Sequence, residues 1–162
     1  MSHARFLLAA SLALFLAGCH ADEAHAPPVT ASASSQTQSA EAESTIDGTT
    51  VHISAVQTSQ LPESVAREYG IERSPRAILL LVNLRDAGSA PAPVISATVT
   101  DLQQHTTPVA LREVHVAQAG DGTTDYIGTV DATLPDTLRF TVLARRGGAT
   151  STVQVSRDFY PQ

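Results

Sequence analysis

Several residue types are rare or absent in this sequence, and each shortage excludes a class of chemistry. The chain has no lysine and no tryptophan, and its 162 residues include one cysteine, Cys19, and one methionine, Met1. A single cysteine cannot form an internal disulfide. Soft ions such as Cu(I) prefer thiolate or thioether ligands, so a copper site in the chain after Cys19 is not expected.

Positive charge is also scarce. Ten basic residues, all of them arginine, stand against sixteen acidic ones, and the formal net charge is −6. A nucleic-acid-binding surface needs clustered positive charge, so nucleic acid is not an expected partner. Neither G-x-S-x-G nor H-E-x-x-H occurs, and the Ser, His and Asp residues cannot be placed together from sequence. We therefore predict a non-enzymatic protein without a cofactor.

Three histidines lie beyond the first fifty residues: His52, His105 and His115. The apolar neighbours of His52 and His115 are expected on the opposite face of a strand, so both imidazoles should point away from the core. His105 is expected in a loop. Because the three side chains are dispersed in this way, the sequence predicts no metal centre.

The first residues have the three parts of a secretory signal. Arg5 supplies a positive charge, and an almost wholly apolar run of about a dozen residues follows from Phe6 to Ala17. That run is too short to cross a hydrocarbon core of roughly 30 Å as a helix. It ends in the sequence L-A-G-C at Cys19, after which the chain turns polar.

The L-A-G-C sequence resembles the lipobox of bacterial lipoproteins. The resemblance implies that residues 1–18 are a signal peptide, that the Cys19 thiol carries diacylglycerol, and that the chain is cut before Cys19. His20 stands where an aspartate would favour the inner membrane, so the resemblance implies the inner leaflet of the outer membrane, facing the periplasm. An ordinary signal peptide that happens to contain a cysteine is the alternative.

Residues 19–44 show no hydrophobic periodicity. They are rich in Ala, Ser, Thr, Gln and Pro, a composition that buries too little apolar surface to fold. We predict a flexible tether with a coil dimension of about 25–30 Å. The remaining residues, 45–162, are enough for a single domain with its own core.

The composition of residues 45–162 is that of a β domain. Val and Thr are abundant, apolar runs are short, and turn residues recur at short intervals. We predict an all-β fold, an immunoglobulin-like antiparallel sandwich of about seven strands. The expected strands are Thr49–Gln57, Ala77–Leu84, Val94–Asp101, Val109–Ala117, Asp125–Asp131, Thr137–Ala144 and Thr150–Phe159.

Alternation within these strands predicts which side chains enter the core. Leu138, Phe140 and Val142 should share the core-facing side of their strand, and Arg139 should lie on the other side. The run AILLLVNL at residues 77–84 is apolar throughout, which is typical of a central strand covered on both faces.

One helical segment, QLPESVAREYGI, interrupts the strands between the first and the second. Pro62 suits the first helical position, and Gly70 suits the position just after the helix. Val65 and Tyr69 fall on one face, which should lie against the sheet. We expect this short helix to plug one open end of the sandwich.

Two longer segments carry a family resemblance. They are VHISAVQTSQLPESVAREYGIERSPRAILLLVNL and LRFTVLARRGGATSTVQVSRDFYPQ, which ends in the aromatic pair Phe159-Tyr160. Together they resemble a family of small secreted proteobacterial proteins of unknown function. The resemblance covers about residues 51–160 and implies a periplasmic immunoglobulin-like domain, but it transfers no functional residue.

The best candidate contact surface lies around the helical segment. Arg67, Arg73 and Arg76 cluster near Tyr69, and Arg and Tyr are enriched where proteins bind one another. We predict that Arg73, Arg76 and Tyr69 contact a partner. A charged turn that only covers the sandwich is the alternative.

The function predicted from these features is that of a membrane-anchored, periplasm-facing lipoprotein. Its lipid on Cys19 would hold it to the membrane, and its sandwich would bind another protein of the cell envelope. The alternative is a periplasmic small-ligand carrier or sensor with a cleft between the sheets. Four Phe and three Tyr in the whole chain are few residues with which to line such a cleft.

Overall fold

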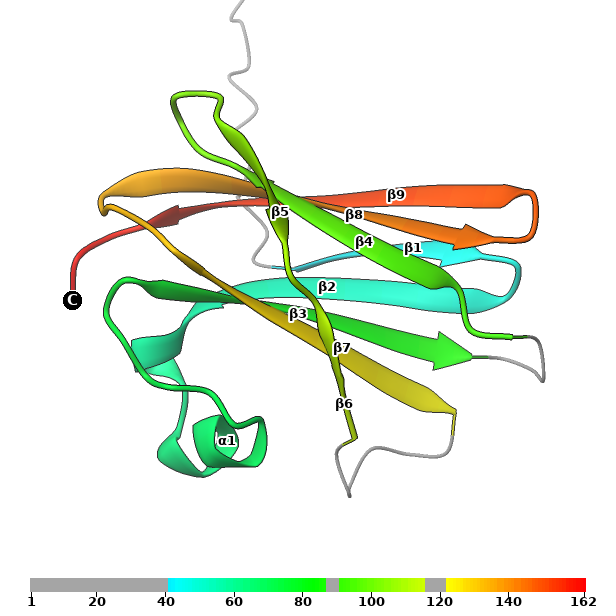
Figure 1. Ribbon diagram of the computed structural model, residues 1–162, viewed down its shortest axis with the longest axis horizontal. Coiled ribbons are helices and arrows are strands. Elements are labelled where there is room, and N and C mark those ends of the chain that lie inside the picture. The colour runs from blue at the N-terminus through cyan, green and yellow to red at the C-terminus, as the bar shows by residue number, and fades with distance from the viewer. Residues whose placement is uncertain (1–40, 87–90, 116–121) are drawn as a thin grey trace, which may run out of the picture. The chain divides into compact units, whose positions relative to one another are not determined.

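The computed structural model describes residues 41–86, 91–115 and 122–162, which form two antiparallel sheets packed face to face (Figure 1). The five-stranded sheet has the order β1 (Glu41–Ile46), β2 (Thr49–Gln57), β3 (Ala77–Asp86), β7 (Thr123–Asp131) and β6 (Arg112–Val114). The four-stranded sheet has the order β5 (Thr106–Val109), β4 (Val94–Thr100), β8 (Asp136–Arg146) and β9 (Ala149–Phe159). The predicted sandwich is confirmed, with nine strands in the described residues.

The first strand, β1, was not predicted. It pairs with β2 from Glu41 opposite Ser54 to Ile46 opposite Thr49, and Ile46 is only 3% exposed. Residues 41–44, which their composition assigns to the tether, therefore lie in a strand. The residues of β1 that face the interior before Ile46 are small, so the segment lacks the apolar alternation that marks a strand in sequence. Cys19 and the rest of the predicted tether lie outside the described residues.

The strand predicted at Val109–Ala117 is wrong, because the chain changes sheets inside it. β5 belongs to the four-stranded sheet and β6 to the other, and Ala110 and Leu111 make the crossover. The crossover passes directly over Gly128 in β7. A Cβ atom on Gly128 would lie 2.5 Å from Val109 Cγ1 and 2.8 Å from the Ala110 carbonyl oxygen. Only glycine admits so close an approach.

The core fills the space between the sheets as alternation predicted. Leu138, Phe140 and Val142 are buried in β8, while Arg139 between them is exposed. Each face of β3 carries buried residues, which confirms that this strand is covered on both sides. The guanidinium of Arg157 also enters the sandwich edge, where Nη1 donates to the Ala55 carbonyl at 2.8 Å.

A single turn of 3-10 helix, Thr58–Gln60, leads into helix α1, Glu63–Glu68. Pro62 is the residue before the helix rather than its first residue, and Gly70 follows the C-cap with φ +60° as expected. No helix in the described parts of the chain has the length and apolar character needed to cross a bilayer.

The expectation that α1 plugs an open end of the sandwich is wrong. The helix lies against the outer face of the five-stranded sheet, on the side away from the four-stranded sheet (Figure 1). Leu79 of β3 and Ile127 of β7 point to that face, and both are buried although they lie outside the main core. With Ala66 of α1, also buried, they account for the position of the helix, because this apolar surface needs cover.

Candidate functional site

A hydrogen-bonded group on the outer face anchors the end of α1. Asp125 of β7 is only 6% exposed, and its carboxylate accepts hydrogen bonds from the Tyr69 hydroxyl at 3.1 Å and from Asn83 Nδ2 at 2.6 Å. Burial, then the charge of Asp125 and the hydrogen bond to it, raise the pKa of Tyr69 to about 12, with a further contribution from Glu68. Tyr69 therefore stays a protonated donor and fixes the helix to the sheet.

The segment between α1 and β3 is held by two buried polar residues, Gln57 at the end of β2 and Thr58 at the start of the 3-10 helix. Thr58 donates its hydroxyl proton to the Ser74 carbonyl at 3.1 Å and accepts the Ser74 N–H at 2.9 Å. Gln57 donates to the Pro75 carbonyl. Both side chains are nearly inaccessible, at 0% and 1% exposure. The helical segment is thus attached at both ends by polar contacts that the main core does not require.

The residues predicted to contact a partner all lie between the end of α1 and the start of β3, but their surroundings differ. Tyr69 is half-buried and bound to Asp125. Arg73 is exposed, and its Nη2 donates to the Ser59 carbonyl at 2.6 Å. The Arg76 side chain is exposed and has no hydrogen bond or ion pair to any described residue, while its main chain bonds to Ser74 and Ala132. Arg76 is therefore the one of the three whose side chain has no role inside the described domain.

A groove of about 600 Å³ runs beside the helical segment, and we call it the helix groove. One wall is the segment after α1, the floor is the second half of β7, and the other wall is the crossover with the start of β6. The lining residues are Gly70, Ile71, Glu72, Ser74, Ala77, Ala110, Leu111, Arg112, Ile127, Gly128, Thr129 and Asp131.

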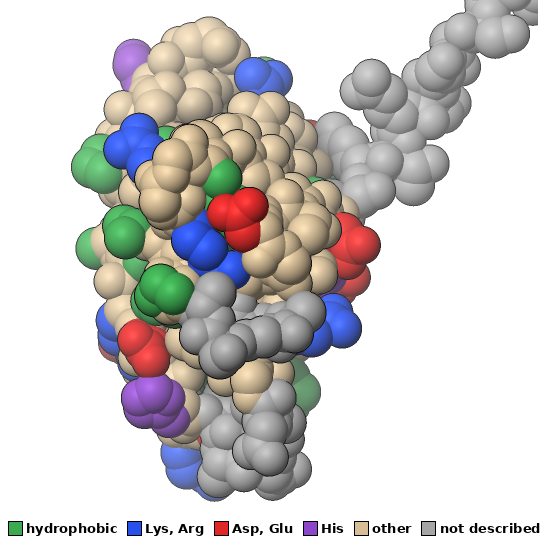
Figure 2. Space-filling view, turned by 90° about the vertical axis from the view of Figure 1, so that its right-hand side faces the viewer, with side chains coloured by type: hydrophobic (Ala, Val, Ile, Leu, Met, Phe, Trp, Pro, Cys, Tyr) green, Lys and Arg blue, Asp and Glu red, His purple; other side chains and the backbone are tan. Residues whose placement is uncertain are grey.

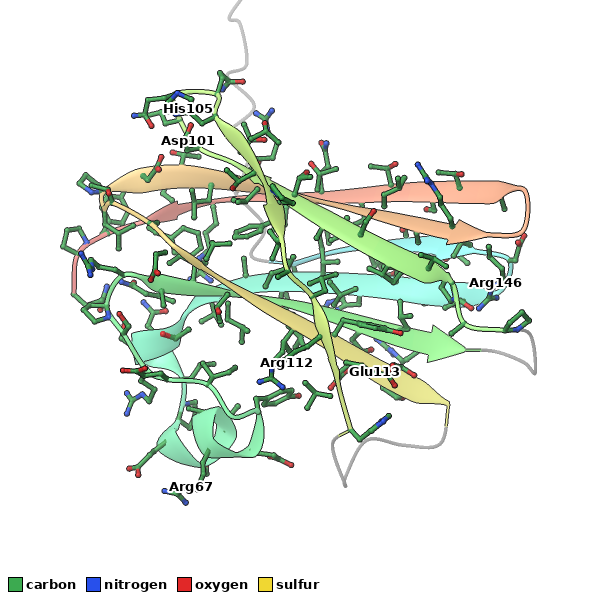
Figure 3. All side chains as sticks on the ribbon, in the orientation of Figure 1. Arg67, Asp101, His105, Arg112, Glu113 and Arg146 are labelled. Atoms are coloured by element: carbon green, nitrogen blue, oxygen red, sulfur yellow. The ribbon has the colours of Figure 1, made fainter. Side chains whose placement is uncertain are left out.

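Arg112 stands at one end of the helix groove, where β6 begins. Its side chain projects from β6 toward α1 (Figure 3). Nη2 donates to the Tyr69 carbonyl and lies 3.4 Å from the Gly70 carbonyl. Nε and Nη1 have no hydrogen-bond partner among residues 41–86, 91–115 and 122–162, and the residue is exposed. The guanidinium is thus held in place while part of its donor set faces solvent.

Sequence reasoning missed Arg112 because it placed the residue inside one continuous strand. The chain changes sheets at Ala110 and Leu111, so the alternation of inward and outward side chains before this point does not continue after it. For this reason, alternation could not predict the face on which Arg112 lies. The residue that would have indicated the change of sheet is Gly128, but it lies in another strand, β7.

A second depression, of about 550 Å³, opens at one end of the sandwich between the β4–β5 and β7–β8 loops. His105 lies in the first of these loops, as predicted, and its Nδ1 is 3.1 Å from Asp101 Oδ2 (Figure 3). Desolvation raises the pKa of Asp101, but the hydrogen bonds from the His105 main chain and ring outweigh it and lower the pKa overall. The floor includes Val99 and Leu138.

The other two histidines sit in separate places. His52 points to the outer face of the five-stranded sheet and lies 3.4 Å from Glu41, and His115 is exposed beyond β6, 3.5 Å from Glu113. The described residues contain no group of three or more His, Cys, Asp or Glu side chains arranged to hold a metal ion.

The end of the sandwich at the β8–β9 turn is chemically mixed. Arg146 joins this turn to the β1–β2 turn, because its Nη1 donates to the Asp47 carbonyl at 3.0 Å. Figure 2 shows basic, acidic and hydrophobic side chains interspersed among the described residues of this face. The described residues of this face therefore form no extended patch of one charge.

Together, these features define a class: small antiparallel β-sandwich domains with a helical segment on one outer face. The chain belongs to the family described as a domain of unknown function, DUF4426, whose sequence profile matches residues 43–162. The expected resemblance to a family of unknown function is confirmed in that respect. No curated protein matches the chain.

A solved structure has the same fold. The crystal structure of a DUF4426 family protein from Pseudomonas aeruginosa superposes with a TM-score of 0.57 and 20% sequence identity. The match covers 76% of this chain and 97% of the Pseudomonas protein. At this identity the likeness concerns the fold and not the residues of a site.

Proposed function

We propose that this protein is a lipid-anchored component of the cell envelope that works by binding another protein. Its signal ends in the lipobox-like L-A-G-C, so lipid on Cys19 would hold it to the membrane, with the sandwich facing the periplasm. The absence of an aspartate after Cys19 favours the outer membrane. In this proposal the domain has no catalytic role.

The helical segment is the observation that carries the binding proposal. The sandwich core closes without it, yet buried polar residues hold it on the outer face. Covering Leu79 and Ile127 explains the apolar side of α1, but it does not explain the exposed arginines. Arg112 lines the helix groove and displays donors that no described residue uses, and the exposed Arg76 side chain has no hydrogen-bond partner among the described residues. A binding surface accounts for all of these features together.

The test is cross-linking of the lipid-anchored protein in intact cells, followed by identification of the captured protein. The double variant Arg73→Ser/Arg76→Ser should capture less of that protein, while its thermal stability stays near that of the wild type, because exposed charges contribute little to folding. Arg76→Ser alone is the cleaner variant, since Arg73 also holds the Ser59 carbonyl. Arg139→Ser, on the outer face of the other sheet, is the matched control. Equal capture by all variants would place the binding surface elsewhere.

The second depression, the one between the β4–β5 and β7–β8 loops, favours a second candidate function, that of a small-ligand carrier. Val99 and Leu138 form part of its floor, and the acidic residues Asp101, Asp131 and Asp136 line it. An apolar floor with acidic groups suits a small cationic molecule. Spermidine, used as a probe, should raise the midpoint of thermal unfolding in the wild type and less in Asp131→Asn. No change in the wild type would reject a cation-binding cleft.

A further inference from the structure

We infer that the helix groove binds the C-terminal tail of a partner protein, as an antiparallel strand added to β7 whose terminal carboxylate is held by Arg112. This inference rests on the proposed binding function and specifies the chemistry of the partner.

The first support is an open strand edge. β7 pairs with β3 along its whole length, from Thr123 to Asp131, but on its other side it pairs with β6 only at Asp125–Ile127. In the part of the chain that the structure describes, residues 128–131 have no strand partner on that side. Alternate backbone N–H and C=O groups of such an edge point outward and can pair with an extended peptide.

The second support is that this edge lies in the groove. Gly128, Thr129 and Asp131 all line it, and Thr129 and Asp131 are exposed. The crossover occupies the core-facing side of Gly128, so an added strand would pair from Thr129 onward. Ile71 and Leu111 stand on opposite walls and offer apolar contact to its side chains. A volume of about 600 Å³ suits a few residues of extended chain rather than a folded element.

The third support determines in which direction the peptide runs and which of its two termini lies at Arg112. β6 runs antiparallel to β7 and starts with Arg112 opposite Ile127. A strand added antiparallel to residues 129–131 would be in line with β6 and would run toward its first residue. The crossover and β6 occupy the continuation, so the added chain has to stop there. A free C-terminus therefore fits, where an internal segment would collide.

The charged residues that line the groove are Glu72, Arg112 and Asp131, and the positive one stands at the end where the carboxylate would arrive. Arg112, with part of its guanidinium unpaired among the described residues, stands where the carboxylate would arrive, and guanidinium–carboxylate pairs are strong and directional. Asp131 lies at the other end of the same edge. The opposite orientation would bring an N-terminal amine to Arg112, and the two positive groups would repel each other.

The experiment uses the full-length lipid-anchored protein in detergent micelles. The probes are a random heptapeptide library with free C-termini and the same library with amidated C-termini. We expect binders among the free-carboxylate peptides, and amidation of a selected binder should weaken it at least tenfold. N-methylation of its backbone amides, one at a time, should abolish binding at alternate positions only, because every second amide faces β7.

Arg112→Gln should remove the preference for a free carboxylate, and Arg139→Gln is the matched control that should keep it. Arg112 also contacts the helical segment, so the amidation and N-methylation series on the wild type decide the matter if this variant is destabilised. The inference is overturned if no peptide binds, if amidated peptides bind equally well, or if N-methylation shows no alternation. Capture of an envelope protein in intact cells together with any of these results would leave the proposed function standing without this mode of recognition.

Discussion

Gly128 is the residue on which the change of sheet depends. The crossover from β5 to β6 passes so close that a single added carbon would overlap Val109 and the main chain of Ala110. Both obstacles belong to the strand end and crossover, so neither moves aside easily. A glycine in the middle of a strand normally weakens it, and here the close approach of another segment explains its presence.

Gly128→Ala should therefore destabilise the domain by about 1–3 kcal/mol, the usual range for overpacking a rigid site. Urea unfolding followed by circular dichroism measures the change. Gly148→Ala is the control, because nothing lies within 4 Å of the Cβ it would gain. Equal stability of the two variants would contradict this prediction, because it would show that the crossover can move enough to accommodate a Cβ atom at position 128.

Phe140 is the largest of the fully buried side chains, and its neighbour Arg139 is exposed on the opposite face of β8. Phe140→Ala should lower the free energy of unfolding by roughly 3–5 kcal/mol, because it leaves a cavity in the core. Arg139→Ala should change it by no more than about 0.5 kcal/mol. Chemical denaturation of both variants compares the two directly, and a larger loss at Arg139 would contradict the register of this strand.

At the scale of elements, α1 and the segment after it depend on polar contacts more than on helix length. A six-residue helix is too short to persist by itself, so its attachment to the sheet decides its position. The Tyr69–Asp125 hydrogen bond holds one end, and Thr58 holds the segment that follows. Both attachments also shape the helix groove, so a change in either should affect binding as well as stability.

The hydrogen bond of Tyr69 predicts a pH dependence. Burial and the neighbouring Asp125 raise the pKa of Tyr69 from its ordinary value of 10.0 to about 12, so folding favours the protonated phenol. The stabilisation is fully present below pH 10 and is lost as the pH rises through about 12. Unfolding midpoints measured from pH 9 upward should fall less steeply in Tyr69→Phe than in the wild type, with ultraviolet absorbance reporting phenolate formation. Identical slopes in the two proteins would show that Tyr69 does not gain its proton affinity from the fold.

For the whole molecule, we propose separate roles for its two parts. The predicted signal with Cys19 would attach the chain to the membrane, and the sandwich would bind the partner. In the proposed function the sequence up to Cys19 would direct the chain to the envelope, and the described domain presents the helix groove. Binding at such a groove needs the domain to stand clear of the bilayer, which is the role that the composition of residues 19–44 predicts for the tether.

Cys19→Ala should abolish membrane association, because the lipoprotein proposal places the diacylglyceryl group on the thiol of this residue, the single cysteine of the sequence. Radiolabelled fatty acid should enter the wild-type protein and not the variant, and fractionation should find the variant outside the membrane pellet. A Ser34→Ala variant is the control for a change of one side chain near the N-terminus. Equal labelling of Cys19→Ala and the wild type would refute the lipoprotein proposal.

The class of fold and the faces of the strands follow from the amino-acid sequence alone, because both depend on a side-chain period of two that is visible over a few residues. The sequence also placed Tyr69, Arg73 and Arg76 in one segment and marked the end of the helix at Gly70. The tertiary structure alone decided where that segment lies, that the chain changes sheets at Ala110, and that Arg112 stands at the end of an open edge. These features arise from contacts between residues far apart in the chain, such as Gly128 with Val109 and Arg112 with Tyr69. The local pattern of apolar and polar residues does not indicate such contacts, since the same pattern is compatible with several ways of packing the strands.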